Sequence, residues 1–308
     1  MKFTKMHGLG NDYIYIETFT QELKGTEKAE LVRTFSDRHF GIGGDGVIFI
    51  HPSAQADCEM EMFNADGSRA EMCGNGIRCV GKLLYDLGLT DHTEISVISA
   101  GKMKYLKMSP AKEEKNPITG MTYGKRKDGQ VIRKVEVNMG EPILQPELIP
   151  VDLENTGMPD TADGKGNDSD ICIDRMIQSD ESVYRMTCVS MGNPHAVIFV
   201  EDTEQFPVTT EGPKLETHSC FPKRANIEFI QILDRNHLKM RVWERGTGET
   251  LACGTGACAA AVAAILNGYT EETVTVHLLG GDLEIRWDRE KNEVFMTGTA
   301  VTVFEGEI

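Results

Sequence analysis

Two helices stand out in the pattern of hydrophobic and polar positions along the chain. The first covers residues 74–87, where apolar side chains recur at helical spacing and Gly88 follows the last of them. The second covers residues 254–266, which carry alanine on nearly every face and end before Asn267-Gly268. A helix that is apolar all round is typical of a buried helix, so we expect strands to surround it.

Short runs of alternating or continuous apolar residues predict strands on both sides of each helix. Residues 47–50 and 227–233 lie before the helices. Residues 95–98, 274–278 and 282–287 lie after them. Both halves of the chain therefore have the same predicted order: a strand, a Cys-Gly-x-Gly turn, a helix and further strands.

Two polar stretches have no counterpart in this order. They cover residues 107–134 and 154–182, and the second contains the sequence DTADGKGNDSD. Because charged and turn-forming residues at this density are typical of loops, we expect both stretches to be surface excursions.

The chain also repeats itself in sequence. The segment FNADGSRAEMCGNG (63–76) aligns with WERGTGETLACGTG (243–256) at an offset of 180, which places Cys73 on Cys253. Near the start, the Gly-Asn pair at 10–11 aligns with a second Gly-Asn pair after a two-residue insertion. Repeated segments indicate repeated structural units, so the simplest explanation is two homologous halves.

Composition and charge narrow the class of partner. The chain has 308 residues, 40% of them hydrophobic, which is ample for a sizeable core and long enough for two domains. The 48 acidic against 32 basic residues give a net charge of −16, which opposes binding to nucleic acid or anionic membranes. The N-terminus lacks a secretory signal and no apolar run is long enough to span a membrane. We therefore expect a cytoplasmic protein that acts on a small substrate.

The paired Cys-Gly turns are the strongest candidates for chemistry. Cys73 and Cys253 each precede a predicted helix, where free backbone N–H groups and the helix dipole favour a thiolate. The same N–H groups, at Gly74-Asn75 and Gly254-Thr255, can bind a carboxylate. An approximate twofold between the halves would make the two cysteines face one another across a single cleft. One thiolate and one thiol so placed can remove a proton from one face of a carbon and return one to the other, as racemisation requires.

The other cysteines and the glycine-rich stretches do not form a recognisable metal-binding or nucleotide-binding motif. No CxxC pair or Cys/His cluster with zinc spacing occurs, and neither a Walker nor a dinucleotide fingerprint is present. We therefore expect no metal and no nucleotide cofactor. Six cysteines are expected to be buried small hydrophobic residues: Cys58, Cys79, Cys172, Cys188, Cys220 and Cys258.

The motifs around these turns resemble diaminopimelate epimerase almost from end to end. This family interconverts L,L- and meso-diaminopimelate without pyridoxal phosphate, in lysine and peptidoglycan precursor synthesis. The motifs are KMHGLGNDY (5–13), GIGGDG (41–46), FNADGSRAEMCGNGIRC (63–79), MGNPHAV (191–197), RANIEF (224–229), ERGTGETLACGTGACA (244–259) and MTGTAVTVFEG (296–306).

The resemblance implies an α/β (α+β) fold of two pseudo-symmetric domains, each a central helix wrapped by mixed, mostly antiparallel strands. The expected domains are residues 1–132 together with the final strand at 300–308, and residues 133–299. The resemblance also implies that Cys73 and Cys253 are the acid–base pair, that no cofactor is needed and that a homodimer can form. It implies substrate ligands at Asn11, Asn64, Gly74, Asn75, Asn193, Asn226, Glu244, Arg245, Gly254 and Thr255, with catalytic support from His195 and Asp66.

Two other classes of function remain open at the level of sequence. A racemase of another amino acid would share the architecture and both cysteines, although proline racemases usually have histidine where this chain has Asn75. Histidine racemases share many of the same turns. A thiol-based redox or binding protein is the alternative outside enzymes of this type, but redox chemistry gives no reason for two symmetry-matched lone thiols.

Overall fold

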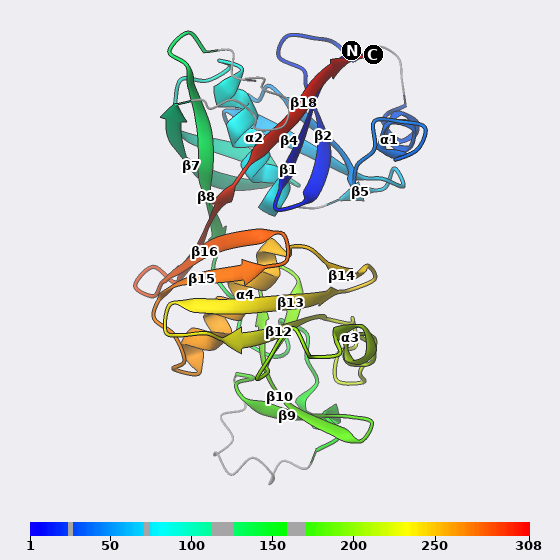
Figure 1. Cartoon of the computed structure of the whole chain (residues 1–308), viewed down its shortest axis with the longest axis vertical. Coiled ribbons are helices and arrows are strands. Elements are labelled where there is room, and N and C mark those ends of the chain that lie inside the picture. The colour runs from blue at the N-terminus through cyan, green and yellow to red at the C-terminus, as the bar shows by residue number, and fades with distance from the viewer. Residues whose placement is uncertain (24–26, 71–73, 113–125, 159–170) are drawn as a thin grey trace. The chain divides into compact units, whose positions relative to one another are not determined.

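The protein, described here by a computed structural model, folds as two compact units (Figure 1). Unit 1 contains residues 1–138 and 297–308, and unit 2 contains residues 139–296. The structure describes residues 1–23, 27–70, 74–112, 126–158 and 171–308. Within these ranges no helix combines the length and the apolar character needed to cross a membrane.

Unit 1 packs one long helix against strands from both ends of the chain. The last strand, β18, pairs antiparallel with β1, which also pairs with β2, so the final strand returns to the first unit as expected. The elements are β1 (Lys2–Gly8), β2 (Asn11–Glu17), α1 (Lys28–Ser36), β3 (Gly46–His51), β4 (Cys58–Asn64), β5 (Arg69–Ala70), α2 (Gly74–Asp86), β6 (Glu94–Ser99), β7 (Lys102–Lys112), β8 (Gln130–Gly140) and β18 (Val301–Glu307).

Unit 2 has a second long helix among its own strands. Its elements are the short 3-10 helix η1 (Leu153–Asn155), β9 (Arg175–Ser179), β10 (Ser182–Ser190), β11 (Pro194–Phe199), α3 (Val208–Glu216), β12 (Asn226–Ile232), β13 (His237–Glu244), β14 (Gly248–Thr250), α4 (Gly254–Leu266), β15 (Thr273–Leu278), β16 (Gly281–Asp288) and β17 (Glu293–Thr299).

The strands pair in the same order in both units, as the sequence repeat predicts. In unit 1, β2 is parallel to β3, β3 is antiparallel to β4, and β4 is antiparallel to β5 and parallel to β6. In unit 2, β11, β12, β13, β14 and β15 have the same relations. Even the register repeats, because Val47 pairs with Phe63 and Ile227 pairs with Trp243. The expected mixed α/β fold with two pseudo-symmetric halves is therefore confirmed.

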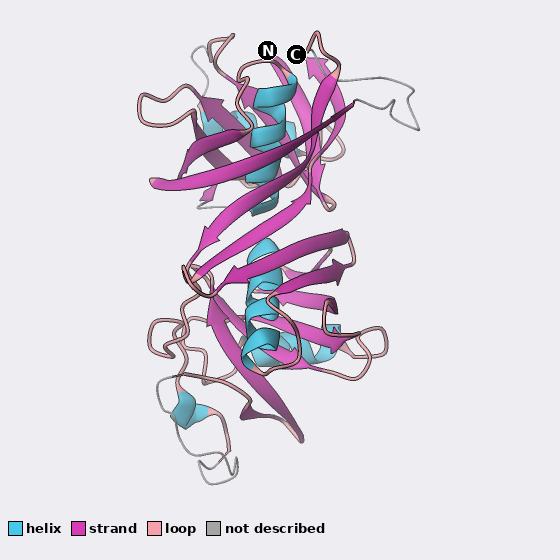
Figure 2. Cartoon of the chain, turned by 90° about the vertical axis from the view of Figure 1, so that its left-hand side faces the viewer, coloured by secondary structure: helices cyan, strands magenta, loops and turns pink. Residues whose placement is uncertain are grey.

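Each long helix is enclosed by strands of its own unit (Figure 2). In α4, every residue except Thr255 and Leu266 is buried, and small alanine side chains let strands approach the helix from several directions. All residues of α2 are buried, including Lys82 and Asp86. Gly88 (φ +72°) and Gly268 (φ +75°) follow the ends of the two helices in the left-handed conformation that favours glycine, and so act as the predicted stop signals.

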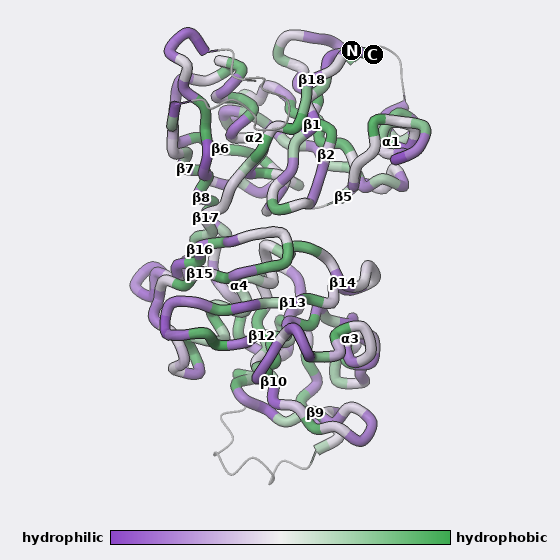
Figure 3. The backbone as a smooth tube through the Cα atoms, in the orientation of Figure 1, coloured by the Kyte–Doolittle hydropathy of each residue, from purple (hydrophilic) through white to green (hydrophobic). Residues whose placement is uncertain are grey.

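The first polar stretch, 107–134, is only in part the surface excursion that we expected. Strands β7 and β8 extend into it from both ends and pair antiparallel, with Ala111 opposite Val131. Hydrophobic and hydrophilic residues alternate along β7 and β8 (Figure 3), so one face is buried while the lysines point outward. The backbone of Ile132 is held by the buried pair on α2, since Asp86 Oδ1 accepts its N–H at 2.8 Å and Lys82 Nζ donates to its carbonyl at 2.8 Å.

The second polar stretch, 154–182, also contains regular structure. Strand β9 lies within it and pairs antiparallel with β10, and Ile177 is fully buried. The middle parts of both stretches, 113–125 and 159–170, lie outside the described residues. A reading based on charge density alone therefore missed short strands whose buried face is apolar.

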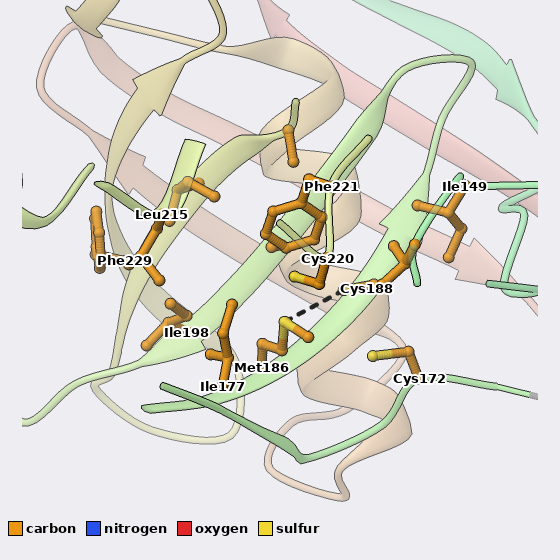
Figure 4. Packing of buried hydrophobic residues seen from close by; sticks show 14 of the residues in the cluster. Ile149, Cys172, Ile177, Met186, Cys188, Ile198, Leu215, Cys220, Phe221 and Phe229 are labelled. Carbon is orange, nitrogen blue, oxygen red and sulfur yellow. Dashed lines mark hydrogen bonds between the residues drawn. The ribbon is translucent and has the colours of Figure 1, made fainter. Parts of the chain in front are cut away.

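Unit 2 has a sulfur-rich core next to β10 and β11 (Figure 4). Cys172, Cys188 and Cys220 are buried here among aliphatic and aromatic side chains, and Cys188 Sγ lies 3.8 Å from Met186 Sδ. Cys58, Cys79 and Cys258 are buried as well, so burial of all six cysteines is confirmed. Burial raises the pKa of the Cys58 thiol to about 12, which keeps it in the protonated, unreactive form.

Candidate functional site

Cys253 lies at the N-terminus of α4, where it is the N-cap residue with extended backbone. Its carbonyl accepts the Ala257 N–H at 2.9 Å, which is the first hydrogen bond of the helix. The residue is only 5% exposed, and its Sγ lies 3.6 Å from Thr255 Oγ1. The loop after β14 thus places a lone buried thiol beside the free N–H groups of a helix start, as the sequence predicts.

The surroundings of Cys253 favour the thiol over the thiolate. Burial raises its pKa well above the usual value, and the nearby carboxylates Glu244 and Glu228 raise it further. Thr255 and the Gly256 N–H act in the opposite direction but are smaller effects. The expectation of a stabilised thiolate is therefore wrong for Cys253, because desolvation and two carboxylates outweigh the helix terminus.

This electrostatic environment predicts an unusual pH dependence for alkylation of Cys253. A free cysteine is half-ionised near about pH 8.5, so its alkylation rate levels off above that pH. In the folded protein, the rate at Cys253 should instead remain low at neutral pH and continue to rise at pH values where alkylation of the unfolded chain has levelled off. Iodoacetamide pulses followed by peptide mass mapping would measure it, with the urea-unfolded chain as control. A folded-state midpoint at or below that of the unfolded chain would contradict the prediction.

A buried glutamate that contacts His195 lies close to Cys253. His195 on β11 and Glu228 on β12 are both fully buried, with Nδ1 2.7 Å from Glu228 Oε1. The other ring nitrogen, Nε2, lies 3.1 Å from Asn193 Oδ1. His195 and Asn193 are among the residues predicted from the sequence, whereas Glu228 is not, although it lies within the RANIEF motif. A glutamate in an otherwise apolar strand run is the signal that could have found it.

Asn226 connects the start of β12 with the turn after β13. Its Nδ2 donates to the Pro194 carbonyl at 2.9 Å, and its Oδ1 accepts the Arg245 backbone N–H at 3.0 Å. The Arg245 side chain is exposed and donates from Nη1 to the Lys223 carbonyl at 3.1 Å. Asn226 is 4% exposed, so its amide shapes the backbone on which Arg245 is carried.

Glu244 and its turn are held by a second glutamate that the sequence analysis also missed. Thr250 Oγ1 donates to Glu244 Oε1 across the β13–β14 hairpin. Glu216, at the end of α3, accepts from the Gly246 N–H at 2.9 Å and from Trp243 Nε1 at 2.8 Å. These two hydrogen bonds to the buried Glu216 carboxylate therefore hold the turn that carries Glu244.

Unit 1 contains two predicted substrate ligands, Asn11 and Asn64, and the predicted supporting residue Asp66. Asn11 begins β2 and its Nδ2 donates to Asp45 Oδ2 at 2.8 Å. Asn64 ends β4, and its Nδ2 donates to Ser68 Oγ at 3.1 Å. Asp66 is exposed and accepts the Ser68 N–H at 2.8 Å, and the hydrogen bonds from Ser68 lower its carboxyl pKa. Asn64 and Asp66 thus share one turn that is closed by Ser68.

The first turn of α2 contains Gly74 and Asn75, both of them buried. Arg78, which is fully buried, donates from Nη2 to Asn75 Oδ1 at 2.9 Å and from Nη1 to the Gly74 carbonyl at 3.1 Å. A buried arginine so close to a helix start adds positive charge there, and the sequence analysis did not single it out. Cys73 lies outside the described residues.

Within unit 2, most of the predicted site residues lie close to another predicted site residue. His195 contacts Asn193, Asn226 contacts Arg245, and Cys253 lies near Glu244 and Thr255. In unit 1 the candidates lie at the start of β2, the end of β4 and the start of α2. A buried thiol whose pKa is raised by burial and by two nearby carboxylates is held in its protonated form and can act as a proton donor.

Comparison with known proteins identifies close relatives along the whole chain. Residues 3–123 and 187–303, which are more than half of the chain, match the family described as diaminopimelate epimerase. Proteins of that name from Agathobacter rectalis and Acetivibrio thermocellus are 51% and 49% identical, over 100% of this chain and 99% and 98% of their own lengths. One from Methanococcus maripaludis is also 49% identical, over 100% of this chain and 99% of its own length.

Solved structures share the fold at much lower identity. A phenazine biosynthesis protein of the PhzF family from Bacillus anthracis has a TM-score of 0.64 at 17% identity, over 100% of this chain and 98% of that one. A probable proline racemase from Agrobacterium radiobacter has a TM-score of 0.65 at 12% identity, over 100% and 92%. These two likenesses concern the fold alone. The family match and the full-length relatives go further, and they show that this chain belongs to the diaminopimelate epimerase family.

Proposed function

We propose that this chain is an isomerase that converts L,L-diaminopimelate to meso-diaminopimelate in lysine and peptidoglycan precursor synthesis. The main support is the combination of full-length identity to proteins of that name with a buried lone thiol, Cys253, at a helix start. The reaction uses the protein's own thiols and no pyridoxal phosphate.

The proposed mechanism uses two cysteines with different resting protonation states. Cys73 begins as the thiolate and removes the α-proton from one face of the substrate. Cys253, whose pKa is raised by burial and by two carboxylates, begins as the thiol and donates its proton to the opposite face. The α-carbon is inverted, and the two sulfur atoms end with exchanged protonation states. The reverse reaction then starts from that exchanged state.

The proposed ligands divide into carboxylate-binding and ammonium-binding groups. The helix starts Gly74-Asn75 and Gly254-Thr255 offer backbone N–H groups to the α-carboxylate at the reacting centre. The Arg245 guanidinium binds a carboxylate, and Glu244 accepts from an ammonium group. The asparagines at 11, 64, 193 and 226 supply or position further donors and acceptors, with His195 and Asp66 in support.

We further propose the domain boundaries, the cellular compartment and the oligomeric state of the protein. The two epimerase halves are residues 1–132 with 300–308 and residues 133–299, and the division of the chain into compact units at 138/139 and 296/297 supports these boundaries. The enzyme acts in the cytoplasm, associates as a homodimer and has no nucleic-acid or membrane partner, in keeping with its net charge of −16.

Deuterium incorporation tests this function directly. Purified protein in heavy water, with no added pyridoxal phosphate, is expected to exchange the α-proton of diaminopimelate and to interconvert the L,L and meso forms. Histidine, proline, lysine and glutamate are measured under identical conditions by mass spectrometry. Aminooxyacetate, which captures pyridoxal phosphate, should not reduce the rate.

Each alternative has a distinct outcome in this experiment. Faster exchange into histidine or proline than into diaminopimelate would replace the substrate while leaving the two-thiol mechanism in place. Cysteine reactivity with no exchange into any amino acid would favour a redox or binding role and would refute the epimerase proposal.

A further inference from the structure

Glu216, the last residue of α3, uses both of its side-chain oxygens to hold β13 and the turn that follows it. Its Oε1 accepts the Gly246 N–H at 2.9 Å, and its Oε2 accepts the Trp243 Nε1–H at 2.8 Å. A backbone amide and an indole can only donate, so the direction of both hydrogen bonds is fixed. Glu216 is 6% exposed, so water cannot easily replace these bonds. We call this pair of hydrogen bonds the Glu216 clamp.

The end of α3 also holds the segment that supports the other side of the turn. The Glu216 carbonyl accepts the Ala225 N–H at 3.3 Å. The next residue, Asn226, accepts the Arg245 N–H through its Oδ1 at 3.0 Å. Two consecutive N–H groups of the turn, those of Arg245 and Gly246, are therefore each held by a side chain from outside the turn.

The turn contains residues that are flexible by nature. Gly246 (φ +76°) and Gly248 (φ +98°) both have left-handed backbone, which glycine adopts readily. The same residues lose the most conformational freedom when the chain is fixed. A ligand on a loose turn must be ordered when the substrate binds, which weakens affinity, whereas a ligand on a turn that is already held does not.

The first half of the chain shows what the same elements look like without the clamp. Helices α1 and α3 lie at the repeat offset of 180, which places Ser36 on Glu216 and Phe63 on Trp243. The phenyl ring of Phe63 has no polar hydrogen to donate. Ser36 Oγ is buried and has no hydrogen-bond partner among the described residues. The side chains at the donor and acceptor positions of unit 1 therefore cannot form the clamp.

The backbone turn itself does not need the clamp. In both units the N–H of the fourth turn residue donates to the carbonyl of the first: Gly67 donates to Asn64 at 2.9 Å, and Thr247 donates to Glu244 at 3.0 Å. The strands on either side also pair in the same register in both units. The fold alone therefore gives no reason for a buried carboxylate at the end of α3.

The two turns differ in the side chain that they carry next to the clamp. In unit 2 it is Arg245, whose exposed guanidinium can offer a carboxylate two parallel donors. In unit 1 the equivalent residue is Ala65. A planar two-pronged donor binds well only when its backbone is fixed in the right direction, whereas alanine has nothing to direct. The clamp thus occurs on the turn that has a charged candidate ligand to position.

We propose that Glu216 is a positioning residue that holds the β13–β14 turn and thereby preorganises Arg245 for a substrate carboxylate. The proposal rests on the proposed function for the identity of the substrate, whereas the effect of Glu216 on the turn is independent of it. Glu216 touches no reacting atom and acts through the Gly246 N–H and the Trp243 indole. Its loss should weaken substrate binding more than it slows the chemical step.

The first test measures the two hydrogen bonds and does not depend on activity. In Glu216→Gln, one of the two accepting oxygens is replaced by an NH2 group, which cannot accept. Hydrogen exchange, followed by NMR of the full-length protein, should then become at least about tenfold faster at the Gly246 amide, the Trp243 indole or both. The indole signal is assigned by its loss in Trp243→Phe. Unchanged exchange at both sites would overturn the proposal.

The second test gives unit 2 the side chains of unit 1. Glu216→Ser combined with Trp243→Phe reproduces the pair Ser36 and Phe63, with which the same turn forms in unit 1. KM for diaminopimelate should rise roughly tenfold or more, while kcat changes much less. Glu216→Gln is assayed in parallel and should show the same KM change if the double variant fails to fold. A folded variant with the wild-type KM would refute the proposal.

A double-mutant cycle tests whether Glu216 acts through Arg245. In the Arg245→Ala background there is no guanidinium to direct, so adding Glu216→Gln should raise KM by less than about twofold. Equal effects of Glu216→Gln in the presence and absence of Arg245 would contradict the proposal, because two independent contributions to binding are additive.

Glu211→Gln is the matched control, since Glu211 is a buried carboxylate on the same helix. It accepts from Tyr184 Oη at 3.0 Å and from Lys214 Nζ at 2.9 Å. Its neutralisation should lower Tm but leave both KM and hydrogen exchange at Gly246 unchanged. If wild-type protein fails to turn over diaminopimelate, the proposed function fails, whereas the exchange measurement still decides whether Glu216 holds the turn.

Discussion

Cys253→Ala is expected to abolish interconversion of L,L- and meso-diaminopimelate. With one thiol missing, no group can return a proton to the opposite face of the α-carbon, and the loss in kcat should be at least about a hundredfold. The remaining Cys73 can still exchange the α-proton of one stereoisomer with heavy water, without inversion. Cys73→Ala should show the mirror result, with exchange confined to the other stereoisomer.

Control variants separate the loss of chemistry from the loss of structure. Cys253→Ser keeps the size of the side chain, but its hydroxyl is far less acidic than a thiol, so activity should fall by orders of magnitude while far-UV circular dichroism is unchanged. Cys258→Ala removes a fully buried thiol from the same helix and should leave turnover close to that of the wild type. Near-normal turnover in either Cys253 variant would disprove the two-base mechanism.

The alanine-rich helix and the sequence repeat carried most of the fold information. The predicted helix at 254–266 coincides with α4, and the predicted helix at 74–87 extends one residue beyond the observed end of α2 at Asp86. Glycine residues mark both ends, because left-handed backbone is unfavourable for other residues. The repeat went further and predicted strand pairings, since matched segments at a fixed offset adopt the same register.

The prediction of secondary structure failed where many charged residues made an alternating strand pattern hard to recognise. The lysines of β7 and β8 face outward, and a prediction weighted by charge took residues 107–134 for a loop, although Met108 and Ile132 are buried on the inner face. The buried pair Lys82 and Asp86 was equally invisible in the sequence. Two charged residues on a helix are normally taken for its solvated face, and only tertiary structure shows that they hold the backbone of β8.

The same limitation applies to the candidate site. Residues in recognisable motifs, such as Cys253, were found, because their types match a chemical task. Glu228 and Glu216 were missed, because each acts on a neighbour that is distant in sequence. Arg78 was missed because an arginine on a helix is normally taken to be exposed, and only the fold shows that it is fully buried. The electrostatic state of Cys253 was also unpredictable, since burial and the proximity of two carboxylates depend on packing.

Arg245→Ala is expected to reduce kcat/KM for diaminopimelate by roughly a hundredfold or more, because a charge-assisted contact with a carboxylate is lost. The guanidinium is well placed for such a contact, since it is exposed and pairs with no carboxylate among the described residues. Its backbone is anchored by Asn226, so the alanine variant should fold normally. Arg245→Lys should recover little, because a single ammonium cannot replace the planar two-pronged donor.

Arg235→Ala is the matched control for this loss. Arg235 lies on the surface of the same unit, paired with Glu271 at 2.5 Å, and its removal changes the net charge by the same amount. Steady-state assays at two salt concentrations would distinguish a specific contact from general attraction, because screening weakens only the long-range part. If Arg245→Ala and Arg235→Ala had equally small effects at both salt concentrations, Arg245 would not be a substrate ligand, and the carboxylate would have to be bound by the helix starts and asparagines alone.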